Sequence, residues 1–412
     1  MLFFFAIVAC INCLFTFARN CEKVNNDKLL TMVALQQIRN SEFLKKRRYE
    51  AFVFLIIFLA FFGGLGYVMG VANMLNTIMN TAWDLLMNTV FYLMGITVLT
   101  GALSRLMIEF GVVRLLEAIL APLMRPLFNL PGVSALAGVM TFFSDNPAII
   151  SLSNDKNFSR YFKTYELVSL TNFGTSFGMG LIVITFMSGF GYFGPAMVGL
   201  AGAICGAVIS TRLMQRFSKK ELAKMSVPES SGDNSQISFK SEGSTFMRLL
   251  NSILDGGKSG VQLGLSIIPG VLVISTIVMI LTFGPDDPAA GYQGLAYEGV
   301  PVLPKLAGYI SIVFEVLFGF EDPELIAFPI TSLGAVGAAL SLVKMYVAEG
   351  LINGNAIAVF TAMGMCWSGY LSTHTAMLDT LGYRQLTSKA LLSHTIGGLF
   401  AGILAHYFFL LA

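Results

Sequence analysis

Long apolar runs separated by short polar segments make up most of the chain, and their lengths predict membrane helices. A helix needs roughly 20 predominantly apolar residues to cross a bilayer. The run from Leu167 to Thr211 is long enough to cross twice. The other runs of sufficient length occupy 51–72, 85–104, 259–285, 350–378 and 390–412. The pattern therefore predicts an all-α polytopic membrane protein.

The distribution of Lys and Arg predicts that one apolar stretch does not cross the membrane. The basic cluster at 45–48 places the start of the 51–72 helix in the cytoplasm, because cytoplasmic loops are enriched in Lys and Arg. If 130–153 crossed fully, the basic loops that follow it would lie outside. A re-entrant hairpin that turns at Ser144 to Pro147 returns them to the cytoplasm. A second hairpin, 325–343, is then predicted to enter from outside.

A shift of 190 residues aligns the two halves, for example Leu127 with Leu317 and Thr171 with Thr361. Three predicted crossings lie between the copies, and an odd number inverts the second copy. Mixed apolar and charged segments at 111–130 and 302–320 suit helices that lie along the membrane surface. The predicted fold has inverted-topology repeats, each with an interfacial helix, a re-entrant hairpin and a broken transmembrane helix.

This reading divides the chain into five parts. Residues 1–31 are open to three interpretations: a transmembrane helix, a signal segment or a start-site artefact. Within them, the Cys10-x-x-Cys13 spacing is better explained by packing than by metal binding, since no second ligand pair is near. The parts are 1–50, an N-terminal apolar segment and basic cytoplasmic region; 51–82, an extra transmembrane helix and external loop; 83–216, the first repeat; 217–257, a cytoplasmic linker; and 258–412, the second repeat.

Composition supports a membrane protein and excludes several other classes. The chain is 55% hydrophobic and 12% charged, which a soluble globular protein would not tolerate. A formal net charge of +2 gives no reason to expect a nucleic-acid partner. No catalytic, phosphate-binding or dinucleotide motif is present, so we expect neither an enzyme nor a bound cofactor. The expected partners are the lipid bilayer and a small solute, with homo-oligomerisation left open.

The strongest functional signal is the polar string Ser144-Asp145-Asn146 within an otherwise apolar stretch. A carboxylate at bilayer depth costs about 2.5 to 3.5 kcal/mol on insertion scales, so it normally faces protein, water or a ligand. Irregular backbone at this depth survives only where it is buried in protein or lines a cavity. We therefore expect the tip of the first hairpin to form part of a binding site.

Two apolar helices contain glycines beside polar side chains near their centres, at 171–180 and 361–370, as discontinuous transporter helices do. Close helix packing is the alternative for the glycines alone. A candidate Na⁺ site consists of Asp145, Asn146, Asn172 and Thr175. The expected coupling ion is Na⁺ or H⁺. The candidate substrate- or ion-binding residues are Ser144, Asp145, Asn146, Thr171, Asn172, Thr175, Ser176, Thr331, Ser332, Thr361, Trp367, Ser368 and His374.

Three stretches give the chain a family resemblance. They are Ala121 to Pro131, the hairpin Phe142 to Pro147, and Leu167 to Ser176. With the second-half copy, the chain resembles the Gate, or nucleoside-recognition, domain family of bacterial membrane proteins over most of 83–412. Relatives of this architecture include concentrative nucleoside transporters and the membrane portion of ferrous-iron transporters. The resemblance implies a bacterial cytoplasmic membrane location and a solute such as a nucleoside.

The sequence thus predicts a secondary transporter with a site at the membrane midplane between two hairpins. The alternative is a non-transporting membrane scaffold or accessory subunit with the same fold. An intramembrane enzyme is a third class, but no paired catalytic group for Asp145 is found. Ligand-dependent stabilisation would separate the first two classes, since a scaffold should show none.

Overall fold

The computed structural model describes residues 46–224 and 244–412, and every regular element in these ranges is a helix. The predictions for the N-terminal segment up to residue 45 and for the central part of the linker, 225–243, lie outside the described residues. The chain divides after Val71 into two units. The first contains the helix Lys46–Met69, and the second contains all the elements that follow.

Six helices within the described residues are long and apolar enough to cross a membrane. The predicted polytopic membrane protein is therefore confirmed at this level. In the first unit, the helix ends where Gly70 adopts a left-handed backbone conformation. The six are Lys46–Met69, Val71–Glu109, Thr164–Gly189, Phe193–Ala223, Thr245–Ile280 and Arg384–Leu411.

The predicted external loop before residue 83 is wrong, because this segment is helical. Helix α2, Val71–Asp84, continues through a π-helical turn, Leu85–Val90, into α3, Phe91–Glu109. Two of its asparagines explain how a polar segment stays helical. Asn73 Nδ2 donates to Tyr292 O and Asn80 Nδ2 to Gly294 O, both at 2.8 Å. A loop from the second half therefore satisfies the amides of this polar segment.

The predicted linker, 217–257, is also too long. Helix α10, Phe193–Lys224, extends past the predicted boundary, and α11, Thr245–Ser266, begins at the N-cap Ser244. Helix α11 then runs through a π-helical turn, Gly270–Ser275, into α12, Thr276–Ile280. Both α10 and α11 therefore carry polar turns beyond their apolar stretches.

Two pairs of short helices stand at the positions of the predicted hairpins. The first pair is α5, Ser134–Phe143, and α6, Pro147–Asn154, and the second is α15, Ala327–Gly334, and α16, Val336–Ala348. At 1.5 Å per residue each helix is about 12 to 20 Å long, too short to cross alone. The second break lies at Ala335, inside the predicted hairpin 325–343. Pro147 begins α6 at a position where its missing N–H costs nothing.

Each pair is followed by an interrupted helix. Helices α8, Thr164–Thr175, and α9, Gly180–Gly189, are separated by a turn in which Met179 has a left-handed backbone. Helices α17, Gly354–Trp367, and α18, Tyr370–Thr380, are separated at Ser368 and Gly369. Both breaks fall inside the segments that the glycine and hydroxyl pattern predicted.

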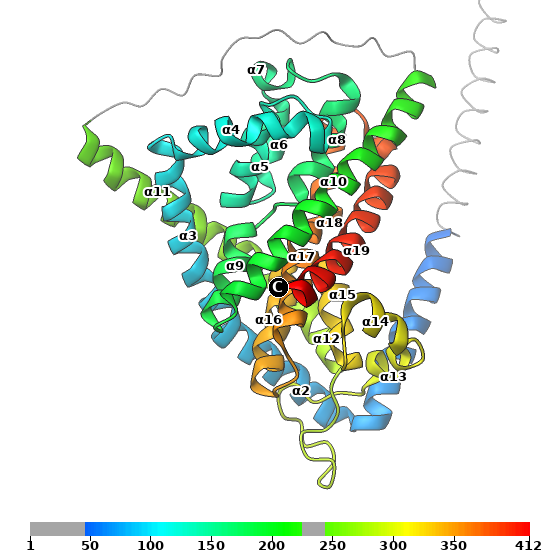
Figure 1. The fold of residues 1–412 in the computed structure, drawn as a ribbon. Helices are drawn as coiled ribbons and strands as arrows, with labels where there is room; N and C mark the ends of the chain where they lie inside the picture. The colour runs from blue at the N-terminus through cyan, green and yellow to red at the C-terminus, as the bar shows by residue number, and fades with distance from the viewer. Residues whose placement is uncertain (1–45, 225–243) are drawn as a thin grey trace, which may run out of the picture. The chain divides into compact units, whose positions relative to one another are not determined.

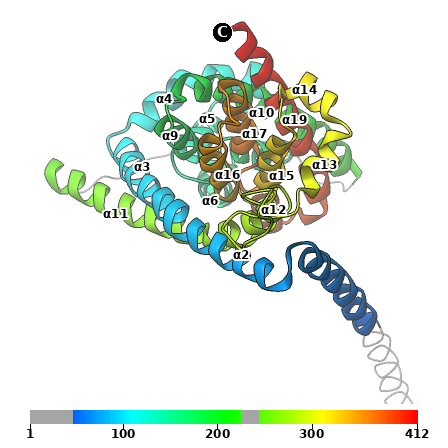
Figure 2. The ribbon, with the colours of Figure 1, turned by 90° about the horizontal axis from the view of Figure 1, so that it is seen from below.

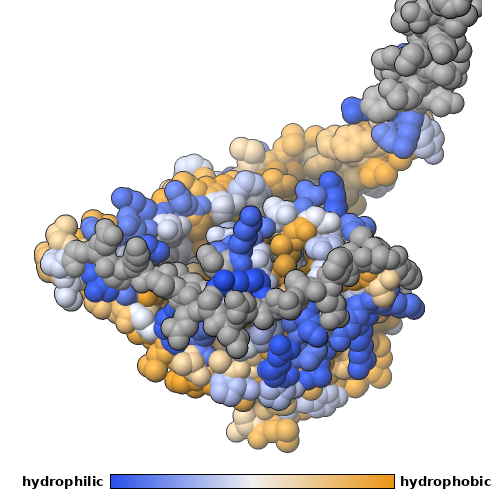
Figure 3. Space-filling model, turned by 90° about the horizontal axis from the view of Figure 1, so that it is seen from above, coloured by the Kyte–Doolittle hydropathy of each residue, from blue (hydrophilic) through white to orange (hydrophobic). Residues whose placement is uncertain are grey.

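Shorter helices precede and connect these elements. Before the first pair lie α4, Val112–Leu123, and the π-helical turn Met124–Phe128; before the second lie α13, Val302–Gly308, and α14, Ser311–Phe318. The remaining connections are α7, Lys156–Ser159, and the 3-10 turns Pro323–Ile326 and Arg384–Leu386, and the chain closes with α19, Thr387–Leu411. At the end of the second unit where α4, α7 and the last turns of α10 lie, hydrophilic side chains gather (Figure 3).

Helix α17 forms the centre of the core. Almost all its residues are buried, and α10 and α19 pack against it. The Phe328 and Phe360 rings stack with centroids 4.1 Å apart, which joins α15 to α17. Helices α3 and α11 lie side by side along one side of the second unit (Figures 1 and 2). The core thus fixes the position of the Ser368–Gly369 break, while α3 and α11 form a separate wall.

Candidate functional site

Residues from all four helix interruptions line one cavity of about 330 Å³. Each interruption frees backbone groups that a continuous helix would pair, so such breaks are stable only beside protein, water or a ligand. The break residues that line the cavity are Asp145, Asn146 and Pro147 from α5–α6, Met179 from α8–α9, Gly334, Ala335 and Val336 from α15–α16, and Gly369 from α17–α18.

Asn146 connects three of the interruptions. Its Nδ2 donates to Ser368 O at 2.8 Å, across the two halves of the chain. Cβ atoms added at Gly178 or Gly369 would overlap the Asn146 amide. Gly369 also has φ +69°, a conformation that L side chains rarely adopt. Glycine is therefore required at both breaks for the hairpin tip to approach.

Two oxygen atoms at this tip have no hydrogen-bond partner within the described chain, Asp145 Oδ1 and Asn146 Oδ1. A buried acceptor left unpaired costs about 1 to 3 kcal/mol, and more when it is charged. Both atoms accept and cannot donate, so they would be satisfied by a cation or by the N–H and O–H groups of a solute. The described residues contain no cluster of three or more His, Cys, Asp or Glu side chains suited to a metal.

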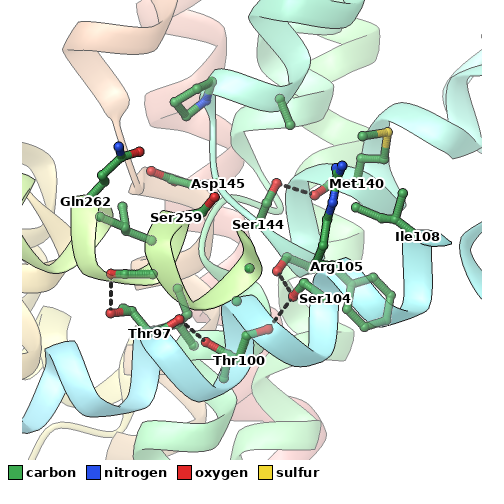
Figure 4. A pocket seen from close by; sticks show the side chains of 18 of the residues that line it. Thr97, Thr100, Ser104, Arg105, Ile108, Met140, Ser144, Asp145, Ser259 and Gln262 are labelled. Carbon is green, nitrogen blue, oxygen red and sulfur yellow. Dashed lines mark hydrogen bonds between the residues drawn. The ribbon is translucent and has the colours of Figure 1, made fainter. Parts of the chain in front are cut away.

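A second cavity, of about 510 Å³, lies between α3, α11 and the first hairpin. It shares Asp145, Pro147, Leu263 and Ser266 with the first, so the two cavities meet at the hairpin tip. Figure 4 shows Asp145, Ser259 and Gln262 on the same side of this cavity. Other polar side chains along its wall are Thr97, Thr100, Ser104 and Arg105.

Sequence reasoning missed the polar residues on α3 and α11. Thr97, Thr100 and Ser104 are spaced at three and four residues, which places them on one helix face. Ser259, Gln262 and Ser266 repeat this spacing on α11. The periodicity was a usable signal, but hydroxyl groups in an apolar helix also bond to their own backbone. Thr100 does so with Ile96 O at 2.8 Å.

Of the predicted residues, Ser144, Asp145 and Asn146 line the cavities, and Ser368 contacts Asn146. The three candidates on α8 and Ser176 at its C-cap do not line either cavity. Asn172 Nδ2 instead donates to Ser210 Oγ and Ala390 O, both at 2.9 Å. The Thr175 hydroxyl donates to Thr171 O, and that of Ser176 to Asn172 O. The predicted Na⁺ grouping of Asp145 and Asn146 with Asn172 and Thr175 stays a prediction: α10 and α19 hold the Asn172 Nδ2 group, while Asn172 Oδ1 has no hydrogen-bond partner within the described residues.

The second-half candidates other than Ser368 also lie away from the cavity linings. Thr331 and Ser332 donate to carbonyls in α15, Ala327 O and Pro329 O. Thr361 is fully buried in the α17 core. These hydroxyls sit within continuous helix, one turn or more from the break, and so meet packed side chains.

Trp367 and His374 face α19. Trp367 Nε1 donates to His394 O at 3.4 Å, and the ring lies against Gly398. The rings of His374 and His394 are 4.5 Å apart. His394 in turn contacts Ser210, which joins it to Asn172. This buried network connects α8, α10, α18 and α19. Its residues line neither cavity, but they hold in place the helices that flank the breaks.

Comparison with solved structures shows which fold this is. CNTnw, a concentrative nucleoside transporter, aligns in an outward-facing state with a TM-score of 0.52 and 11% identity, over 88% of this chain and 85% of that one. An intermediate state of CNTnw gives 0.51 and 12%, over 87% and 84%. The chain has a CNT-like fold.

Sequence comparisons add one curated relative. The sporulation integral membrane protein YlbJ of Bacillus subtilis strain 168 is 39% identical over 74 residues. The match covers 17% of this chain and 18% of YlbJ, so the chain spans less than a fifth of that relative. No family model matches. Together the comparisons support a multi-pass membrane protein with a transporter-like fold.

Proposed function

We propose that this protein is a secondary transporter that carries a small polar solute, such as a nucleoside, across a bacterial cytoplasmic membrane. The observation that carries the proposal is the 330 Å³ cavity lined by all four helix interruptions, with unpartnered acceptors on Asp145 and Asn146. Transporters of known architecture place their sites at such discontinuous helices. The CNT-like fold supports the same function, and the name of CNTnw places nucleosides among the solutes to test.

We propose further that the two halves are inverted repeats. Gly354 at the start of α17 lies beside Phe409 at the end of α19 and Pro195 at the start of α10. Asn355 Nδ2 donates to Phe318 O, which brings the end of α14 to the same place. The second hairpin is therefore approached from the end where α10 begins.

The first hairpin is approached from the opposite end of α10. Arg212, in the second half of that helix, donates to Leu127 O, in the turn that precedes the first hairpin. Arg125 in the same turn pairs with Glu166 at the start of α8, at 2.6 Å. Approach from opposite ends supports the inverted arrangement, and the breaks of the two copies then meet near the midplane.

Transport in proteoliposomes tests the function. The purified chain is screened for uptake of nucleosides, nucleobases and amino acids, with and without gradients of Na⁺ and H⁺. We expect uptake of at least one solute, and we expect Asp145→Asn and Asn146→Ala to lower it by about tenfold or more, because each removes a charged or close polar contact. Asn154→Ala, an exposed residue at the far end of α6, is the control and should transport normally.

Two outcomes would contradict the proposal. If no solute is taken up and none stabilises the purified protein, the chain is better described as a membrane scaffold or accessory subunit. If uptake occurs but neither Asp145→Asn nor Asn146→Ala changes it, the site lies elsewhere.

A further inference from the structure

The two joined cavities contain one cationic and one anionic side chain. Among all the residues that line either cavity, only Arg105 and Asp145 are charged near neutral pH. Arg105 extends from α3, four residues before its last residue, Glu109, and Asp145 lies at the hairpin tip (Figure 4). The larger cavity therefore carries opposite charges on walls formed by different elements.

These two charges do not neutralise each other. Neither side chain takes part in an ion pair within the described residues, so no N–O distance between them is 4.0 Å or less. The Asp145 Oδ1 atom is buried and has no partner. A charge removed from water without a partner is costly, and the cost falls when a ligand of opposite charge binds. Asp145 is therefore buried without a cation, whereas the exposed Arg105 offers an unpaired guanidinium to an anion.

Three polar side chains of α11 line the cavities on the side of Asp145 (Figure 4). They are spaced about one turn apart and comprise Ser259, Gln262 and Ser266. The side chains of Gln262 and Ser266 are exposed. Their hydroxyl and amide groups both donate and accept hydrogen bonds. A solute bound beside Asp145 would therefore also meet hydrogen-bonding groups from α11.

We propose that the transported solute is a small zwitterion, such as an α-amino acid, whose ammonium group binds at Asp145 and Asn146 and whose carboxylate is held by Arg105. This inference rests on the proposed transport function and narrows its substrate class. An ammonium supplies the N–H donors that the orphaned oxygens lack. The planar guanidinium of Arg105 suits a carboxylate, which it can bind through two parallel hydrogen bonds. A neutral nucleoside would leave Arg105 unused.

The test compares matched ligands on the purified full-length chain. Thermal unfolding is measured with a panel of α-amino acids and nucleosides, and for each stabilising amino acid with its methyl ester and its N-acetyl derivative. The ester keeps only the cation and the N-acetyl form only the anion. We expect the amino acid to raise the melting temperature at a concentration at which both derivatives have little effect. Each measurement is made with Na⁺ and with choline as the salt cation.

Variants assign the carboxylate to Arg105. Arg105→Gln should weaken the apparent affinity for the amino acid by about 10- to 100-fold, the range expected for loss of a charge-assisted hydrogen bond. Binding of the methyl ester should stay unchanged, and Arg105→Lys should recover part of the affinity. Arg384→Gln, an exposed residue that lines neither cavity, is the control for loss of a positive charge.

Failure of this inference can be told apart from failure of the transport function. Stabilisation by a nucleoside that Arg105→Gln does not change would overturn the zwitterion and leave transport standing. If the N-acetyl derivative binds as well as the amino acid only when Na⁺ is present, the cation at Asp145 is Na⁺ and the ammonium assignment is wrong. If no compound in the panel stabilises or is transported, the proposed function itself fails.

Discussion

At the scale of single residues, the site depends on how closely backbone can approach the Asn146 side chain. Its amide lies among Gly178, Ser368 and Gly369, residues that come from two different helix breaks. A polar side chain that bridges breaks in this way fixes their relative position. Its geometry therefore controls both stability and the shape of the cavity.

Gly178→Ala tests this close approach. The added Cβ would overlap Ser368 Oγ and Asn146 Oδ1, so the hairpin tip or the α17–α18 break must shift. We expect the free energy of unfolding to fall by about 1 to 3 kcal/mol, as for other overpacked sites. Solute binding should weaken as well. Gly194→Ala, at a helical position with nothing within 4 Å of the added atom, should be neutral or slightly stabilising. Denaturant titration of both variants makes the comparison, and equal stability would contradict the packing described.

The residues also show what the sequence could reveal. Asp145 and Asn146 were predicted because polar groups in an apolar run need a special environment. Asn172 gave the same signal, but its partners are Ser210 and Ala390, which lie 38 and 218 residues away in the chain. A polar residue that lines a cavity and one that is satisfied inside the core look alike until the partners are known.

At the scale of elements, α3 and α11 pack through glycine. Gly256, Gly260 and Gly264 recur every four residues on α11 and meet α3 near Gly101, Thr97 and Met94. Such small residues let membrane helices approach closely. Thr97 Oγ1 of α3 donates to Gly260 O of α11 at 2.8 Å, which links the two helices. This contact sets the distance between the polar faces that line the larger cavity.

Gly260→Ala should separate these helices, whereas Gly257→Ala should not. A Cβ at Gly260 would overlap Thr97 O and lie 2.5 Å from Val98 Cα, and neither backbone can move alone. At Gly257 the nearest atom is Val98 Cγ1, at 3.7 Å. We expect Gly260→Ala to lower the free energy of unfolding by about 1 to 3 kcal/mol. Gly257→Ala should change it by less than about 1 kcal/mol. Thermal unfolding in detergent decides, and equal losses would show that the helix contact lies elsewhere.

Two carboxyl groups, one at each end of the second hairpin, should make the stability of the fold depend on pH. Burial raises the pKa of Glu324, and the carboxylates of Glu349 and Asp322 raise it further. The pKa of Glu349 is raised by burial and by Asp286. Both groups bind a proton more tightly in the folded state, so their contribution to stability is full below the unfolded pKa of 4.5. It is lost as the pH rises through the higher folded values.

Melting temperature should therefore fall as the pH rises above 4.5, over the range in which these carboxyl groups ionise. Glu349→Gln should raise the melting temperature at pH 7 and flatten this part of the profile, because it removes one of the repelling charges. Glu315→Gln, an exposed residue of α14, should leave the slope unchanged. A steeper profile for Glu349→Gln would mean that its carboxylate stabilises the fold.

Element positions were predictable where composition changes sharply, as at both hairpins and both interrupted helices. The exceptions share a cause. The segment before residue 83 is predicted as a loop because it lies between two apolar runs, and the partners of its asparagines, in 292–294, are far away in the sequence. The α3–α11 cavity depends on which helix faces meet. A single sequence gives the period of a helix, but the facing element is set by packing across the whole chain.

At the scale of the whole molecule, the central question is whether each hairpin enters and leaves on one side. Tyr346 Oη donates to Glu324 O at 2.8 Å, so the two ends of the second hairpin meet. Asn154 Nδ2 lies 3.4 Å from Thr380 Oγ1, which brings the end of the first hairpin beside the end of α18. These contacts predict that the two ends of the second hairpin lie on one side of the membrane, and that the end of the first hairpin lies on the same side as the end of α18. The positive-inside rule assigns the Asn154 end to the cytoplasm.

Single-cysteine labelling tests this topology in a cysteine-free background. Lys156→Cys and Asp379→Cys should react with a membrane-impermeant maleimide in inside-out vesicles but not in intact cells. Glu321→Cys and Glu349→Cys should show the reverse, because the second hairpin is approached from the other side. All four residues are exposed, so accessibility depends on the membrane alone. Glu321 and Glu349 on opposite sides would mean that the second hairpin crosses the bilayer. Lys156 and Glu321 on the same side would make the repeats parallel, and the polar breaks would then have no reason to converge at one depth.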